Sequence, residues 1–265
     1  MSDATSVLKR KLERAEKHIF NLNDAWDGFV ESGAYPIESE DDPDTGDRIY
    51  RIVNVAPIDP DFPLIIGDAI NNIRSALDHL AYHLVQLGPA PIEKVYFPVG
   101  NLSKEFETTL GGIKERLRSD AVKPMSEIKA YQGGRDEILW QLNCLNNIDK
   151  HRLLLTVSAQ NRFHSMRPSE ARDIYWNFLG VDLDPIIAAG HLHTQRWDPI
   201  VDLKPRDILK RVPKDEVQEN MQFPIEIAFG ESKILKGYPV IVTLHRMCDR
   251  VRSIINEFGS FGLLD

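Results

Sequence analysis

The stretch LIIGDAINNIRSALDHLAYHLVQL, residues 64–87, is the longest stretch that clearly predicts a helix, and it decides which fold we expect. Its apolar residues recur at intervals of three and four, which places them on one face of a helix. Gly88 and Pro89 follow directly and end the helix. We therefore expect a long helix that packs along this apolar stripe. The stripe consists of Ile66, Ile70, Ile73, Leu77, Leu80 and Leu84.

The polar residues of the same helix are unusual for a surface that only meets water. Neither Glu nor Lys occurs between Pro63 and Pro91. Asn, Asp and Ser take their place, although these side chains compete for the backbone and are poorer helix formers. We therefore expect the polar face to meet protein, a ligand or a second subunit. Its members are Asp68, Asn71, Asn72, Ser75, Asp78, His79 and Tyr82, with Arg74 and His83 flanking the apolar stripe.

A second helix, expected at residues 135–151, has a comparable face. Leu139, Leu142, Leu145 and Ile148 form its apolar stripe. Amides and cations lie on its other side, and two such faces can close a buried hydrogen-bond network, because buried polar groups have to be paired. This structural interpretation competes with any catalytic one. The amide-and-cation cluster consists of Asn143, Asn146, Asn147, Lys150 and His151.

The remaining segments predict an α+β fold, a helical bundle with a small, mainly antiparallel sheet. We expect one domain over residues 1–265, with a helical core at about 1–155 plus 237–260 and a β-rich part at about 156–236. The acidic residues 38–47 predict a solvated loop, and Pro124 starts a connector. Further helices are expected at residues 6–30, 103–120 and 237–258, and strands at 48–55, 152–160, 223–232 and, more weakly, within 171–202.

Composition limits the function classes. The 265 residues carry a net charge of −8, which argues against broad coating of nucleic acid but permits a small basic site. Cys144 and Cys248 lie far apart without metal-ligand spacing and predict free thiols of a reducing compartment. The N-terminus lacks an apolar signal region, and no apolar run approaches the roughly 20 residues of a membrane span. We therefore expect a cytoplasmic protein without a membrane partner.

Arg74 and His79 suggest a catalytic interpretation of the long helix. Arg offers a fork of donors and a fixed positive charge for a phosphate, and His can act as general base or acid near neutral pH. The two residues lie about 140° apart on a helix, so we expect them to converge on a substrate in a groove or across a dimer axis. Together they suffice for metal-independent RNA cleavage, in which the 2′-hydroxyl attacks the adjacent phosphorus.

An Arg followed after four residues by a His, late in one helix of a bundle, resembles the motif of the HEPN superfamily. The match here is Arg74 and His79 within NNIRSALDHLAYHL, residues 71–84, and the resemblance covers about residues 1–155. HEPN proteins are bundles of four or five helices. Many are RNases of toxin–antitoxin, abortive-infection and CRISPR systems that dimerise so that two Arg–His pairs form one cleft. RSALDHLA and LNNIDKHR, residues 145–152, are also similar to stretches of uncharacterised bacterial proteins.

The resemblance implies a metal-independent endoribonuclease or RNA-binding protein, a homodimer, and an antitoxin or defence-system partner. His79 would be the base and Arg74 the phosphate stabiliser. Residues 150–169 contain no acidic side chain, so they could approach a phosphate backbone. The supporting residues that would orient the pair or the RNA are Asn72, Asp78, His83, Asn147 and His151. The expected RNA-binding residues are Lys150, Arg152, Arg162 and Arg167.

Other functions remain open at this point, including whether the protein is an enzyme at all. A non-catalytic interaction or scaffold protein would use the polar helix faces as structure. A DinB-like metal-binding bundle would join His79 and His83, four residues apart, to His18, His151 and Asp78. We assign no metal ligand. We expect no cofactor, because the chain has no Walker A, GxGxxG, GxSxG or kinase motif.

Overall fold

The computed structural model describes residues 3–89, 94–152, 157–161, 203–217, 223, 225–230 and 234–264. Within these residues the chain is mainly helical and carries small antiparallel sheets, so the predicted α+β class is confirmed. The weaker strand candidates at 171–202 lie outside the described residues.

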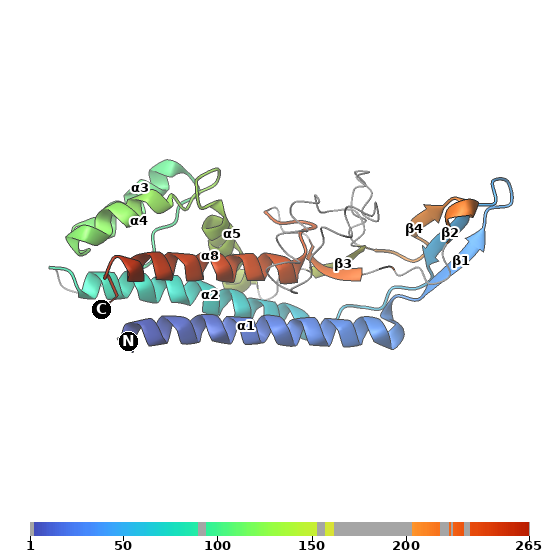
Figure 1. The fold of residues 1–265 in the computed structure, drawn as a ribbon, viewed down its shortest axis with the longest axis horizontal. Helices are drawn as coiled ribbons and strands as arrows, with labels where there is room; N and C mark the ends of the chain where they lie inside the picture. The colour runs from blue at the N-terminus through green and yellow to red at the C-terminus, as the bar shows by residue number, and fades with distance from the viewer. Residues whose placement is uncertain are drawn as a thin grey trace.

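Three long helices lie side by side and form the centre of the molecule (Figure 1). They are α1 (Asp3–Phe29), α2 (Asp61–Gln86) and α8 (Val240–Ser260), and α1 runs antiparallel to the other two. Every residue of the predicted apolar stripe of α2 is fully buried. The long helix therefore takes the orientation that its spacing predicts. It begins after Asp59, whose carboxylate accepts the amide N–H of Asp61 at 2.9 Å.

Three shorter helices build the side of the molecule that carries the site. α5 (Glu137–Arg152) contacts both α2 and α8, while α3 (Ser103–Lys114) and α4 (Val122–Ile128) pack on each other near the end that holds both termini (Figure 1). The prediction that Pro124 starts a connector is wrong, because the helix α4 forms there. Pro124 is the third residue of α4, where a missing N–H costs no helical hydrogen bond. Single turns occur at η1 (Val30–Ala34), η2 (Ser119–Ala121) and η4 (Lys214–Glu216).

The described strands form two sheets. One has the order β1-β2-β4 and projects beyond the bundle, and the other pairs β3 with β5, all antiparallel (Figure 1). β4 has no counterpart among the predicted strands. β3 starts later than expected because α5 continues through Arg152. The strands are β1 (Ile37–Asp41), β2 (Arg48–Ile52), β3 (Val157–Asn161), β4 (Ile208–Val212) and β5 (Ile225–Phe229).

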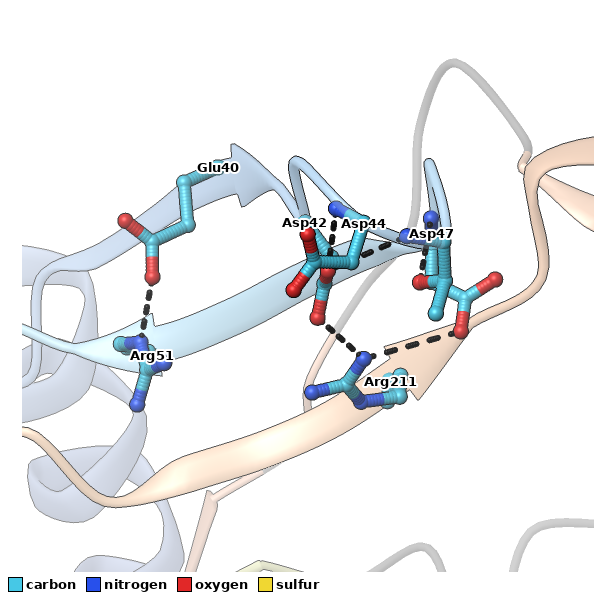
Figure 2. Close-up of polar contacts among 7 residues, drawn as sticks. Glu40, Asp42, Asp44, Asp47, Arg51 and Arg211 are labelled. Carbon is cyan, nitrogen blue, oxygen red and sulfur yellow. Dashed lines mark hydrogen bonds and ion pairs between the residues drawn. The ribbon is translucent and has the colours of Figure 1, made fainter.

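The acidic segment 38–47 is only partly the solvated loop that we expected, because its first residues form β1. Cross-strand cations compensate the acids: Glu40 pairs with Arg51 of β2 at 2.8 Å. In the loop itself, the Asp42 carboxylate accepts the backbone N–H groups of Asp44 and Thr45 and so caps the turn. The same carboxylate pairs with the Arg211 guanidinium at 2.5 Å, and the Asp47 carboxylate lies 3.7 Å from that guanidinium (Figure 2). Arg211 belongs to β4 and lies far away in the sequence, so the charges near residues 38–47 could not predict this ion pair.

Both cysteines are free thiols, as predicted. Burial raises the pKa of Cys144 to about 11 and that of Cys248 to about 12, so both stay protonated at neutral pH. No helix in the described part of the chain is long and apolar enough to cross a membrane.

Gly88, directly after α2, lets the end of α3 approach the bundle. A Cβ at this position would collide with the backbone carbonyl of Arg116. Beside this contact, the backbone N–H of Arg118 donates to the backbone carbonyl of Leu84 in α2 at 3.4 Å. The glycine thus lets the backbone of Arg116 lie close to the end of α2, which matters for the site described below.

We predict that Gly88→Ala lowers the free energy of unfolding by about 1–3 kcal/mol, because a backbone carbonyl has to move aside. Gly28→Ala is the matched control: a Cβ there meets nothing within 4 Å, and the helix should gain up to about 1 kcal/mol. Urea unfolding of both variants measures this. Equal stabilities would contradict the close approach.

Candidate functional site

A pocket of about 430 Å³ lies where α2, α3 and α5 meet the segment 94–99. This volume falls in the usual range of about 300–1,000 Å³ for sites that hold small ligands. Four separate parts of the chain contribute to its wall. The lining residues are Arg74, Asp78, Lys94, Tyr96, Phe97, Val99, Thr109, Gly112, Ile113, Arg116, Asn143, Asn146 and Asn147.

Arg74 is the most constrained of these side chains. It is only 6% exposed, and three protein acceptors hold its guanidinium. Nη1 donates to Asp78 at 2.6 Å and Nε donates to the side-chain oxygen of Asn143 at 3.1 Å. Nη2 donates to the backbone carbonyl of Phe97 at 3.2 Å. Arg74 therefore ties α2 to α5 and to the segment 94–99.

Asp78 completes this network from the next turn of α2. The carboxylate oxygen that pairs with Arg74 also accepts the backbone N–H of Phe97 at 2.9 Å. Burial lowers the pKa of Arg74, and the adjacent carboxylate of Asp78 opposes this effect. An arginine remains charged in proteins, so the guanidinium of Arg74 stays cationic beside its counter-charge at the pocket.

The pocket is cationic in an acidic protein. Among the described lining residues, Arg74, Lys94 and Arg116 are cations and Asp78 is the one carboxylate. Arg116 is half-buried and donates to the carbonyl of Gly112 at 3.1 Å. The formal balance of +2 contrasts with −8 for the chain. Such a concave, positively charged site attracts anions.

Three amides of α5 line the pocket opposite α2. Asn143 already accepts from Arg74, Asn147 is exposed, and Asn146 is only 3% exposed. The side-chain oxygen of Asn146 has no hydrogen-bond partner among the described residues. The pocket therefore offers cations, amide groups and one buried amide oxygen that lacks a partner among the described residues.

Among the predicted site residues, the pocket brings together Arg74, Asp78 and Asn147. His79 is absent from its lining and is exposed on α2. Arg74 turns toward α5 while His79 faces away, as expected from residues about 140° apart on one helix. Within a single chain the two side chains therefore do not share this pocket.

The other supporting residues on α2 also lie outside the pocket lining. The Asn72 side chain donates to the carbonyl of Asp68 at 2.8 Å. His83 is half-buried near the end of the helix, and its Nε2 has no partner among the described residues. Burial, together with the nearby charge of Arg118, lowers the pKa of His83.

Several predictions fall where the structure gives no side chain. Lys150, His151 and Arg152 form the last turn of α5, but their side chains are outside the description. Arg162 and Arg167 lie outside the described residues altogether. Among the residues that are described, no three His, Cys, Asp or Glu side chains gather where they could hold a metal ion.

Sequence reasoning missed Lys94, Tyr96 and Arg116 as site residues. Lys94 and Tyr96 belong to a segment without periodicity, which predicts only a loop. Arg116 follows a short, charged helix and resembles any surface cation. The amide cluster of α5 was the one available signal, because Asn143, Asn146 and Asn147 stood out as an unusual polar face.

Comparison with family models, with curated proteins and with solved structures found no match for this chain.

The Arg74–Asp78 pair should be essential for stability. We predict that Asp78→Ala lowers the free energy of unfolding by about 3–5 kcal/mol, since it leaves a buried guanidinium without its counter-charge. The control is Asp120→Ala, which removes the partner of Arg118 at the surface and should leave the unfolding midpoint unchanged. Urea denaturation followed by circular dichroism compares them. Equal effects of the two substitutions would contradict a structural role for the buried pair.

Proposed function

We propose that the protein binds RNA at the pocket between α2, α3 and α5. The observation that carries this proposal is the pocket's cationic wall, with a buried, fixed Arg74, in a chain of net charge −8. Phosphate contacts by Lys and Arg supply most of the affinity of proteins for nucleic acids. A small positively charged site can bind a phosphate backbone even though the protein surface as a whole is acidic.

The geometry of Arg74 supports a phosphate-binding role. Its three hydrogen bonds use three of the five N–H donors of a guanidinium, which leaves two for a ligand. The side chain is already ordered before binding, so little conformational entropy is lost when an anion arrives. Lys94 and Arg116 add two cations with fewer constraints.

An aromatic side chain beside the cations favours a single strand over a free inorganic anion. Tyr96 lines the pocket and is 63% exposed. Proteins that bind single-stranded nucleic acids combine a positive groove with aromatic rings on which bases stack. The resemblance of Arg74 and its helix to the HEPN motif supports RNA as the nucleic acid. A role in toxin–antitoxin or phage-defence systems rests on that resemblance alone and stays a prediction.

For RNA binding we predict that Lys94→Ala with Arg116→Ala weakens the affinity for a short single-stranded RNA severalfold. Removing two phosphate contacts should also make the slope of log K against log salt shallower by about 1.4. Fluorescence anisotropy over a range of KCl concentrations measures both quantities. Lys123→Ala, at an exposed position of α4, should leave both unchanged. A double variant that binds with the wild-type slope would overturn the proposal.

We propose RNA cleavage as a second function, with His79 as the base that accepts the proton of the 2′-hydroxyl. The exposed position of His79 favours it, since the imidazole has no hydrogen-bond partner among the described residues. Because His79 lies outside the pocket of its own chain, cleavage would use RNA that extends beyond the pocket or a second subunit. The homodimer implied by the HEPN resemblance would supply the latter.

Cleavage is tested with a labelled RNA pool in EDTA. We predict products with 2′,3′-cyclic phosphate ends, and a loss of at least about 100-fold in rate for His79→Ala with its melting temperature unchanged. Gln86→Ala, exposed on the same helix, is the control and should keep the wild-type rate. Light scattering on the same samples gives the oligomeric state. RNA that binds but stays intact would remove the catalytic function and leave the binding proposal standing.

A further inference from the structure

The most unusual side chain of the pocket is Asn146. It is 3% exposed, it lines the pocket, and its oxygen accepts no hydrogen bond from the described residues. A buried amide oxygen without a partner costs free energy, and folded proteins retain few such groups. Its location at a pocket suggests that its partner arrives with the ligand.

We infer that Asn146 recognises the base of a bound nucleotide, and that adenine is the base it selects. This inference rests on the proposed RNA binding at the same pocket. A side-chain amide has one acceptor and one donor group in a plane. Adenine presents a matching donor and acceptor on two edges, at N6 with N1 and at N6 with N7, and the Asn–adenine pair is a common mode of base recognition.

The other pocket residues favour a base that brings one donor group and several acceptors. Arg74, Lys94 and Arg116 donate only, while the Asp78 carboxylate already accepts from Arg74 and Phe97, and the oxygen of Asn143 accepts from Arg74. The unpaired oxygen of Asn146 is thus matched by the single amino group of adenine, while the ring nitrogens accept from the surrounding donors. Guanine would bring additional donors into a donor-rich pocket. Tyr96, exposed at the same pocket, offers a ring for stacking, and a purine provides the larger face.

The test compares labelled uridine octamers that carry one central adenosine, cytidine, guanosine or purine riboside, which is adenosine without its amino group. With wild-type protein we expect the adenosine octamer to bind about tenfold more tightly than the purine riboside and all-uridine octamers. Asn146→Leu, close in size, should bind all of them alike, with the affinity for the all-uridine octamer kept within about twofold. Asn54→Ala, at an exposed position outside the pocket lining, should preserve the adenosine preference.

Each other result is decisive. Equal affinity of the wild type for every octamer, still dependent on Lys94 and Arg116, would overturn base recognition and leave RNA binding intact. A preference for cytidine, guanosine or uridine would overturn the assignment to adenine. Absence of RNA binding would remove both proposals. The purine riboside comparison needs only the wild-type protein, so it decides whether the adenine amino group is recognised even if Asn146→Leu does not fold.

Discussion

The buried ion pair between Arg74 and Asp78 is the interaction on which this part of the molecule depends. A guanidinium that is 6% exposed is tolerated only where a counter-charge and hydrogen-bond acceptors surround it. Asp78, Asn143 and the carbonyl of Phe97 meet this need from three separate segments. The pair therefore constrains how α2, α5 and the segment 94–99 come together.

The same constraint creates the site. Arg74, which joins α2 to α5, also lines the pocket that residues of α3 border from a separate segment. Gly88 permits the close approach that brings Arg116 to this space. One arginine thus acts as a structural tie and as a fixed positive charge at a pocket. The structural and the ligand-binding interpretations of the polar helix face are compatible, because they use different donors of one guanidinium.

His79 shows where reasoning from the motif alone stops. Arg74 and His79 are close in sequence, yet one is buried in a network and the other is exposed. The helical period predicts that the two side chains point in different directions. It does not predict which neighbouring residues each side chain contacts. Any catalytic partnership between them has to involve RNA outside the pocket or a second copy of the chain. The pocket itself is a property of packing, and its cations Lys94 and Arg116 carry no local signal.

The sequence by itself determined the long helices, their buried stripes and the α+β class. The periodic burial of apolar groups is a local property that the spacing encodes, as in Ile66, Ile70, Ile73, Leu77, Leu80 and Leu84. The sequence also marked the amide-rich face of α5 and the polar face of α2 as unusual. Only the tertiary structure decided which polar groups meet. Arg74 with Asn143, Arg211 with Asp42 and the pairing of β4 with β2 all join segments far apart in the chain. Such partners follow from the packing of whole elements, and no periodicity within either segment specifies them.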